Sequence, residues 1–410
     1  MRCLPSLASA CANCHCACPP KHPFESTLAV STPLPPLPLP DGVRAGYADT
    51  TQGLHMHYLE AGYAGDVTDK PLLLLLHGFP ELAFSWRHQL PVLAAAGYHV
   101  VAPDQRGYGR TTGGDDRFDG DWQASHMLQL VADAVALVEA LGHSHVACVI
   151  GHDFGSPVAA WCALTRPDVF HAVVMMSAPF AGPPPSTDAL AVHQKITDVV
   201  HGLGNLQPPR QHYQWYYSGP QANADMWHAP QGLHGFLRAY YHVKSADWAP
   251  NQPHPLAGWT AQAWAELPDY YIMGAMDTMA QAVAPFMPSS EDIAACQWLP
   301  DTELAVYVGE YQRSGFQGGL QWYRCGTDAA LFAQLGQQWG GKTIDVPSAF
   351  IAGASDWGVY QMPGAFEAMQ TKACSQMRLC QLIPHAGHWV QQERPDEVNA
   401  LLLGFLNSLA

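Results

Sequence analysis

One stretch constrains the fold of this chain more than any other. It is Ile150-Gly151-His152-Asp153-Phe154-Gly155-Ser156, which ends an apolar run and begins an Ala-rich helical pattern. The pattern predicts a strand, a sharp turn and a helix, with a glycine two positions before and after Asp153, where a Cβ atom would crowd the turn. The residue at the apex of such a turn is presented at the top of a sheet. Asp153 is therefore the candidate nucleophile.

A carboxylate at the apex limits the chemistry. A carboxylate nucleophile forms an ester with the group that it attacks, and this ester must be hydrolysed afterwards. The electrophile is therefore expected to be a carbon that bears a leaving oxygen or halogen, and not the carbonyl of an ordinary ester or peptide. The structural alternative is an aspartate that caps the helix after an ordinary strand.

Short apolar runs alternate with segments of helical spacing along much of the chain. This alternation is typical of a parallel sheet that helices cover on both faces. Residues 43–60 alternate in a way that predicts a hairpin of two edge strands. The strands that this alternation predicts are 72–76, 99–102, 146–150, 172–176, 349–352 and 378–383.

The alternation stops between residues 183 and 331. Trp, Tyr, Phe, Met and His become frequent there, on predicted helices such as 233–243 and 264–273. We therefore predict an α/β core formed by residues 38–182 and 332–410, with residues 183–331 inserted as a helical cap. Sheets of this kind bind ligands at the carboxyl ends of their strands, and a cap would enclose the pocket there.

The charge of the chain excludes several classes of partner. The formal net charge is −16 with 19 Lys and Arg residues among 410, and the basic residues form no cluster. Nucleic acid and anionic membrane surfaces are therefore not expected as partners. The longest aliphatic run, 72–76, is far shorter than the ~20 residues of a membrane span. We expect a soluble, cytoplasmic protein, as a monomer or a homodimer.

Residues 1–37 are predicted to be a disordered leader. Five of the 11 cysteines lie in its first 18 residues, and it has no acidic residue before Glu25, as in an organellar transit peptide. A poor secretory signal is the other targeting hypothesis. Residues 11–15 read Cys-Ala-Asn-Cys-His, which matches a c-type haem attachment string, but the Pro-rich segment 33–40 leaves no helices to enclose a haem. We expect no cofactor and no metal.

An ester on Asp153 requires a base that activates water and an acid that orients the base. Asp356 follows the strand predicted at 349–352, and His388 follows the one at 378–383. Both side chains are thus expected at the carboxyl edge of the sheet, in the chain order nucleophile, acid, histidine. The structural alternatives are a helix cap for Asp356 and a hydrogen-bonded histidine for His388. His385 is expected to be structural.

Hydrolysis of the ester also requires donors for the oxyanion that develops on its carbonyl carbon. The backbone amide of Phe154 directly follows the apex. The amide of Phe79 belongs to the turn His77-Gly78-Phe79-Pro80, where a cis Pro80 would aim it inward. His77 is expected to be a hydrogen-bonded turn residue and not a second base.

With these motifs the sequence resembles the α/β-hydrolase epoxide hydrolases, and it is similar to the hydrolase domain of soluble epoxide hydrolases over residues 38–410. The most specific matches lie in the predicted cap, at 212–217 and at 306–311 with its continuation 314–324. The resemblance implies the α/β-hydrolase fold and one cap tyrosine from each motif that binds the epoxide oxygen. By register these are Tyr213 and Tyr307, with Tyr216, Tyr217 and Tyr311 as nearby alternatives.

The resemblance implies that a small apolar epoxide and water are converted to a 1,2-diol without a cofactor. A phenol, with a pKa of about 10, can bind the ring oxygen and then protonate the alkoxide. A haloalkane or haloacid dehalogenase would use the same Asp153, but that family usually has a halide-binding Trp where this chain has Phe154. A binding protein that has lost turnover is the alternative from another class.

Overall fold

The structure is a computed structural model that describes residues 34–63 and 70–409. The chain divides into two units, Met1–Pro38 and Leu39–Ala410. The described residues of the first unit, 34–38, have no regular secondary structure. Predictions about the leader, including the haem string and the targeting hypotheses, fall mainly on residues 1–33 and lie outside the described residues.

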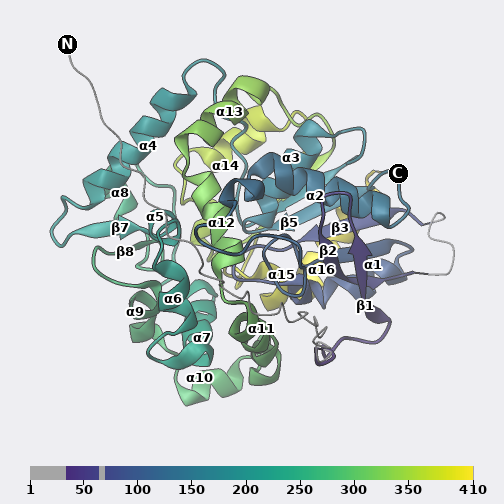
Figure 1. Ribbon diagram of the computed structural model, residues 1–410, viewed down its shortest axis with the longest axis horizontal. Helices are drawn as coiled ribbons and strands as arrows, with labels where there is room; N and C mark the ends of the chain where they lie inside the picture. Colours follow the sequence, from purple (N-terminus) through teal and green to yellow (C-terminus); the bar gives the residue numbers. More distant parts are fainter. Residues whose placement is uncertain (1–33, 64–69, 410) are drawn as a thin grey trace, which may run out of the picture. The chain divides into compact units, whose positions relative to one another are not determined.

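The second unit contains an eight-stranded sheet in the order β1-β2-β4-β3-β5-β6-β9-β10 (Figure 1). β1, β2 and β4 pair antiparallel, and the remaining pairs are parallel. The predicted fold class, α/β with a mostly parallel sheet, is confirmed. The strands are β1 Val43–Asp49, β2 His55–Ala61, β3 Leu72–Leu76, β4 His99–Pro103, β5 Cys148–His152, β6 Val173–Met176, β9 Ser348–Gly353 and β10 Met377–Ile383.

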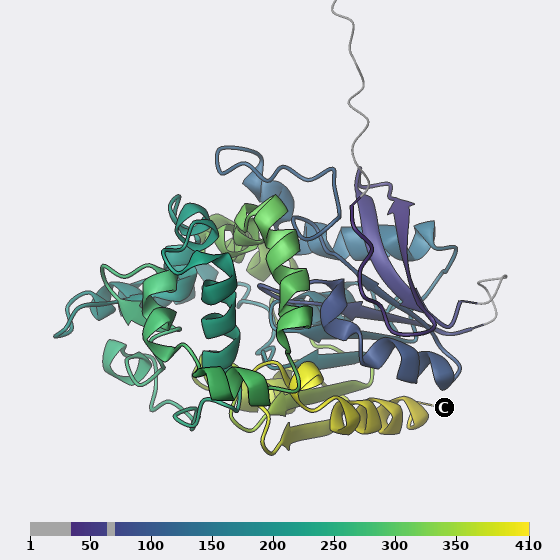
Figure 2. The same ribbon diagram turned by 90° about the horizontal axis from the view of Figure 1, so that it is seen from below.

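Helices cover both faces of this sheet. α1 and α16 contact each other on one face, and α2 and α3 contact each other on the other (Figure 2). β3 is five leucines, all buried, as a strand covered on both sides requires. The helices of the core are α1 Gln89–Ala95, α2 Met127–Ala140, α3 Gly155–Thr165, α14 Ala365–Ala368, α15 Val390–Glu393 and α16 Pro395–Asn407.

Between β6 and β9 the chain leaves the sheet and forms what we call the helical segment, residues 177–347. Figure 2 shows it next to the carboxyl ends of the parallel strands. The predicted end of the cap at residue 331 falls inside α13. The elements are α4 Ala189–Leu203, β7 Arg210–His212, α5 Tyr213–Tyr217, α6 Ala222–Trp227, α7 Gly232–Lys244, α8 Ala261–Trp264, β8 Ile272–Gly274, α9 Met279–Val283, α10 Ser290–Ala295, α11 Asp301–Ser314, α12 Gln317–Gly326 and α13 Ala329–Trp339.

The prediction of a helix over 264–273 is wrong. α8 ends at Trp264, and residues 272–274 form β8, which pairs antiparallel with β7. Pro268 has no N–H group with which to continue a helix. Its carbonyl instead accepts hydrogen bonds from the N–H groups of Tyr271 and Ile272, in a turn that starts the strand.

Of the helices in residues 34–63 and 70–409, none combines the length and the apolar character that a membrane crossing needs.

Helix α12 approaches the core unusually closely. A Cβ atom on Gly318 would lie 2.2 Å from the carbonyl oxygen of Gly107, and one on Gly107 would lie 2.5 Å from the carbonyl carbon of Gly318. Four residues further along α12, the indole N–H of Trp322 donates to the carbonyl oxygen of Arg106 at 3.0 Å. The contact between the two glycines thus fixes how far α12 lies above the sheet. It also fixes the position of the side chains further along that helix.

Replacing Gly318 with alanine should therefore lower the free energy of unfolding by about 1–3 kcal/mol, because a backbone segment must move to admit the methyl group. Gly309→Ala in α11 is the matched control. A Cβ there meets nothing within 4 Å, so the better helix former should raise stability by about 0.5–1 kcal/mol. Chemical denaturation of both variants measures the difference, and a Gly318→Ala protein as stable as wild type would contradict the close contact.

Candidate active site

The predicted turn around Asp153 is formed as the sequence indicates. β5 ends at His152, Asp153 has φ +51°, and α3 begins at Gly155. A Cβ on Gly151 would lie 1.9 Å from the carbonyl oxygen of Gly155, and one on Gly155 would lie 2.2 Å from that of Leu76. Only glycine fits at these two positions. The turn leaves the Asp153 carboxylate at the carboxyl edge of the sheet.

The structure brings together the three residues of the predicted triad. His388 Nε2 lies 3.1 Å from Asp153 Oδ2, and His388 Nδ1 lies 3.0 Å from Asp356 Oδ1. Gly358 N–H donates to the same Asp356 oxygen at 2.7 Å. Asp153 is 9% exposed, and Asp356 and His388 are each 1% exposed. The imidazole thus bridges two carboxylates in a space shielded from water.

The second oxygen of the Asp153 carboxylate is held by the turn after β3. Phe79 N–H donates to Asp153 Oδ1 at 2.8 Å, and the Phe79–Pro80 peptide bond is cis. Glu81 stabilises this turn, because its buried carboxylate accepts a hydrogen bond from Gly78 N–H at 3.0 Å and lies 2.5 Å from His152 Nδ1. The Phe79 amide was predicted, whereas the role of Glu81 was not.

Phe154 occupies the N-cap position of α3. The first N–H groups of a helix have no carbonyl partner within it, which leaves them available to an anion. The Phe154 ring lies 5.3 Å from that of Trp322 and 5.1 Å from that of Tyr323. The use of its amide as the second oxyanion donor stays a prediction.

Tyr213 and Tyr323 lie at the same site. Tyr213, in α5, donates to Gln361 Oε1 at 3.2 Å and accepts from Gln214 Nε2 at 3.1 Å. Its ring lies 5.9 Å from that of Tyr323 in α12. Burial, and then the charge of Asp153, raises the pKa of both phenols well above its ordinary value. Both hydroxyls therefore stay protonated and can donate.

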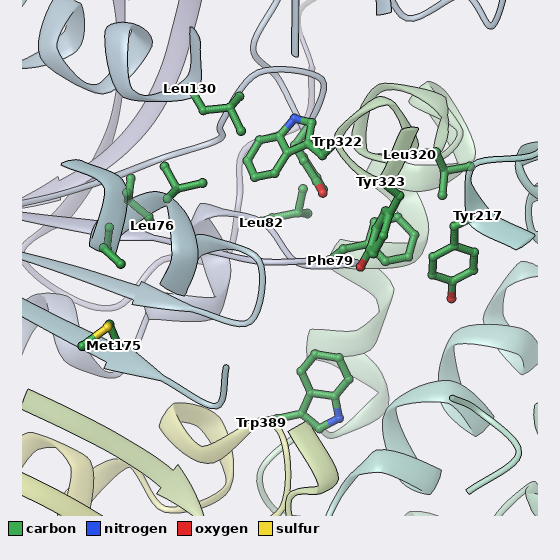
Figure 3. Close-up of a cluster of buried hydrophobic side chains, with 14 of the residues drawn as sticks. Leu76, Phe79, Leu82, Leu130, Met175, Tyr217, Leu320, Trp322, Tyr323 and Trp389 are labelled. Atoms are coloured by element: carbon green, nitrogen blue, oxygen red, sulfur yellow. The ribbon is translucent and has the colours of Figure 1, made fainter. Parts of the chain in front are cut away.

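Tyr323 belongs to a cluster of buried side chains that includes the aromatic rings of Phe79, Tyr217, Trp322 and Trp389 (Figure 3). Its ring lies 5.4 Å from Phe79 and 5.0 Å from Tyr217. The Tyr217 hydroxyl donates instead to Tyr240, 3.3 Å away. Two members of this cluster interact with Asp153 directly: the Phe79 amide donates to Oδ1, and the charge of Asp153 contributes to the raised pKa of Tyr323.

The structure does not bring Tyr307 to the triad. Tyr307, in α11, is fully buried, and its hydroxyl lies 2.9 Å from Ser85 Oγ and donates to Gln392 Oε1 at 3.1 Å. Tyr323 stands where Tyr307 was expected. The sequence held one signal for this: Gly318 and Gly319 let α12 approach the core, and the next turn of the helix carries Tyr323.

The remaining candidates lie away from the triad contacts described above. His77 Nδ1 lies 2.9 Å from the carbonyl oxygen of Gly78, and its Nε2 accepts from Gln105 N–H at 3.1 Å. This is the turn role expected of it. His385 is exposed and has φ +56° in the loop before His388. Tyr311 donates to the carbonyl oxygen of Glu81.

Comparison with known proteins places this chain. Residues 71–208 match the family described as alpha/beta hydrolase fold. The chain is 33% identical over 365 residues to epoxide hydrolase A of Mycobacterium tuberculosis, and the alignment covers 88% of this chain and 96% of that protein. It is 34% identical over 351 residues to epoxide hydrolase B of the same organism, with 83% and 92% covered. The chain belongs to the epoxide hydrolase family.

Solved structures of the epoxide hydrolase family have the same fold. An epoxide hydrolase from an endophytic Streptomyces aligns with a TM-score of 0.71 at 34% identity, covering 90% of this chain and 97% of that one. Potato (Solanum tuberosum) epoxide hydrolase I aligns with a TM-score of 0.66 at 28% identity, covering 89% and 99%. The predicted family, its fold and the assignment as an enzyme of this family are confirmed.

The charges of the triad stabilise one another. Burial raises the pKa of Asp153 and of Asp356, but contact with His388 outweighs burial and lowers both below the ordinary value. Burial and the charge of Lys244 lower the pKa of His388, yet the two carboxylates outweigh them and raise it to about 9. At neutral pH the resting site of this epoxide hydrolase family member is therefore an imidazolium between two carboxylates.

NMR titration of the His388 ring nitrogens between pH 6 and 10 should show deprotonation near pH 9, and Asp356→Asn should lower the midpoint. Because the folded pKa lies above the 6.5 of an ordinary histidine, the protonated ring stabilises the fold fully below about pH 6.5. This contribution to the free energy of unfolding is lost as the pH rises through about 9. A wild-type midpoint at or below pH 6.5 would contradict the charge arrangement.

Proposed function

We propose that this chain hydrolyses a small apolar epoxide to a 1,2-diol through a covalent ester on Asp153. The observation that carries the proposal is the position of His388 Nε2, 3.1 Å from the candidate nucleophile and oriented by Asp356 on its other nitrogen. In this proposal the helical segment acts as the predicted cap and supplies the tyrosines that bind the epoxide oxygen. Monomer or homodimer, and a cytoplasmic location, remain predictions.

In the first half-reaction Asp153 Oδ2 attacks an epoxide carbon, and the ring C–O bond breaks as the new C–O bond forms. Oδ1 is suited to become the ester carbonyl oxygen, because the Phe79 amide already donates to it. The epoxide oxygen departs with the bonding pair and takes a proton from Tyr213 or Tyr323. The His388 imidazolium then returns a proton to the tyrosinate and becomes neutral.

In the second half-reaction neutral His388 takes a proton from water through Nε2 while the hydroxyl adds to Cγ of Asp153. The oxyanion on Oδ1 is stabilised by the amides of Phe79 and Phe154. When the Cγ–Oδ2 bond breaks, the diol leaves with the proton of the new carboxylic acid. Asp153 is again a carboxylate and His388 an imidazolium, so the cycle is closed.

A mostly apolar cavity that reaches Phe154, the residue after Asp153, supports an apolar substrate. Its volume is about 80 Å³, and its lining includes Phe154, Trp322 and residues of α2, α12 and α13. A space of this kind suits a short alkyl or aryl substituent. The other apolar lining residues include Met127, Leu128, Leu130, Leu331, Phe332 and Leu335, and the polar ones include Ser125, His126 and Gln334.

The alternatives receive less support. Halide binding needs an N–H donor near the nucleophile, but the Phe154 ring has none and the Trp322 indole donates to the carbonyl oxygen of Arg106. A binding protein without turnover gains nothing from a base that an acid orients toward the nucleophile.

The ester can be trapped. His388→Gln should still be alkylated by styrene oxide or a short fatty epoxide, but should hydrolyse the ester at least about 100-fold more slowly, since its base is gone. Intact mass spectrometry should then find the protein heavier by one substrate molecule, while Asp153→Asn gains no mass. Absence of the adduct in His388→Gln, with diol released by wild type, would rule out covalent attack.

The tyrosines can be distinguished from one another. Tyr213→Phe and Tyr323→Phe should each slow adduct formation by about 10- to 100-fold, because each removes a donor to the alkoxide. Tyr307→Phe is the matched control, since its hydroxyl contacts Ser85 and Gln392, and should change this rate little. Rapid quenching and mass spectrometry measure the rates. A larger effect at Tyr307 than at Tyr323 would restore the register predicted from the sequence.

A further inference from the structure

The carboxyl end of helix α7 packs directly against the loop that carries His388. His388 N–H donates to the carbonyl oxygen of Lys244, the last residue of α7, at 2.9 Å. A Cβ atom on Gly387 would lie 2.5 Å from the backbone of both Ser245 and Ala246. The two segments thus touch through their backbones, directly beside the candidate base.

One carboxylate joins these segments. Glu393 accepts from the N–H groups of Gly387 at 2.8 Å, Trp389 at 2.9 Å and Ala246 at 2.9 Å. The indole N–H of Trp389 donates to the carbonyl oxygen of Tyr241 in α7 at 2.8 Å. The position of Lys244 relative to His388 is therefore fixed by four hydrogen bonds in addition to their own.

The Lys244 side chain is buried among aromatic rings. It is 3% exposed, and Nζ lies 5.2 Å from the ring centres of Tyr240 and Tyr271, 5.4 Å from Trp389 and 6.0 Å from Tyr270. Across the part of the chain that the structure describes, Nζ forms no hydrogen bond and no ion pair. Cation–π contacts and the carboxyl end of α7 stabilise the ammonium in place of a carboxylate. No carboxylate therefore neutralises the Lys244 ammonium by direct contact.

That charge acts on the reacting groups. Lys244 lowers the pKa of Asp153 and opposes protonation of His388. Other titratable groups close to the His388 ring include Asp153 after β5, Asp356 after β9 and His152, whose ring centre is 5.2 Å away. In the proposed mechanism the phenols of Tyr213 and Tyr323 also exchange a proton with the His388 ring. His152 is itself bonded to the buried Glu81.

Ester formation changes this balance in one way only. Asp153 loses its negative charge when its oxygen becomes alkylated, whereas Asp356 keeps its negative charge and Lys244 its positive charge. The Asp356 carboxylate then raises the pKa of His388 while the Lys244 ammonium lowers it. This balance suits a base that must work near neutral pH. Burial also opposes the proton on the ring, but without Lys244 no nearby positive charge would offset Asp356, and the pKa of His388 in the ester would be higher.

We propose that Lys244 is a positioning residue of the triad, a fixed positive charge that keeps His388 neutral, and thus able to take a proton from water, once Asp153 has become an ester. The inference rests on the proposed ester mechanism. Lys244 touches neither the substrate nor the water in this account, and it acts only through His388.

The test compares Lys244→Met with Lys244→Arg and wild type. Each protein is mixed with excess styrene oxide between pH 5.5 and 9.5, and the fraction of adduct is followed by rapid acid quenching and intact mass spectrometry. Lys244→Met should move the pH midpoint of the ester-hydrolysis rate upward by about one to two pH units. At a pH below the wild-type midpoint, its ester hydrolysis should therefore be slower than that of wild type by about 10-fold or more. Above both midpoints its rate should equal that of wild type. Lys244→Arg should keep the wild-type midpoint.

Arg238→Met is the matched control, because Arg238 is a buried cation of the same helix whose charge is paired with Asp301 at 2.7 Å. Its midpoint should not move. An unchanged midpoint in Lys244→Met, or a slowing of equal size at every pH, would overturn the inference and leave Lys244 a packing residue. A wild-type protein that forms no adduct and no diol would be a different result, since it would refute the proposed function itself.

Discussion

The ring of His388 lies between the carboxylates of Asp153 and Asp356, with all three side chains shielded from water. A buried charge left without its partner costs several kcal/mol, so each of the three groups stabilises the position of the other two. The residues follow three different strands, β5, β9 and β10. Their contact therefore depends on the order and register of the whole parallel sheet. In this chain the sheet is what aligns the site.

The helical segment is fixed to this sheet by contacts that leave little freedom. Gly107 and Gly318 touch through their backbones, and the buried Arg110 pairs with Glu310 at 2.7 Å. These contacts set the height and rotation of α11 and α12 above the carboxyl ends of the strands. Tyr323 reaches the site because α12 can approach so closely. The proposed use of its hydroxyl thus depends on two residues that have no side chain.

The sequence was enough to predict the elements that local pattern and chain order determine. The turn at Asp153 follows from its glycines, and Asp356 and His388 follow from their places after predicted strands, where the topology leaves one edge for all three. Tyr307 was expected in place of Tyr323 because the resemblance was placed in register on the motif at 306–311, and nothing in that motif shows that α12, and not α11, brings a tyrosine to the site. Lys244 carried no signal at all, since a lysine at a helix end is usually a solvated residue.

The two halves of the proposed reaction make opposite demands on His388. In the resting enzyme two carboxylates hold the ring as an imidazolium, which keeps all three buried charges paired but leaves no base. In the ester the ring has to be neutral. The chemistry itself removes this conflict, because alkylation of Asp153 abolishes the negative charge that contributed to holding the proton. The base is therefore produced by the step that creates its substrate, and water meets an active base only after the ester exists.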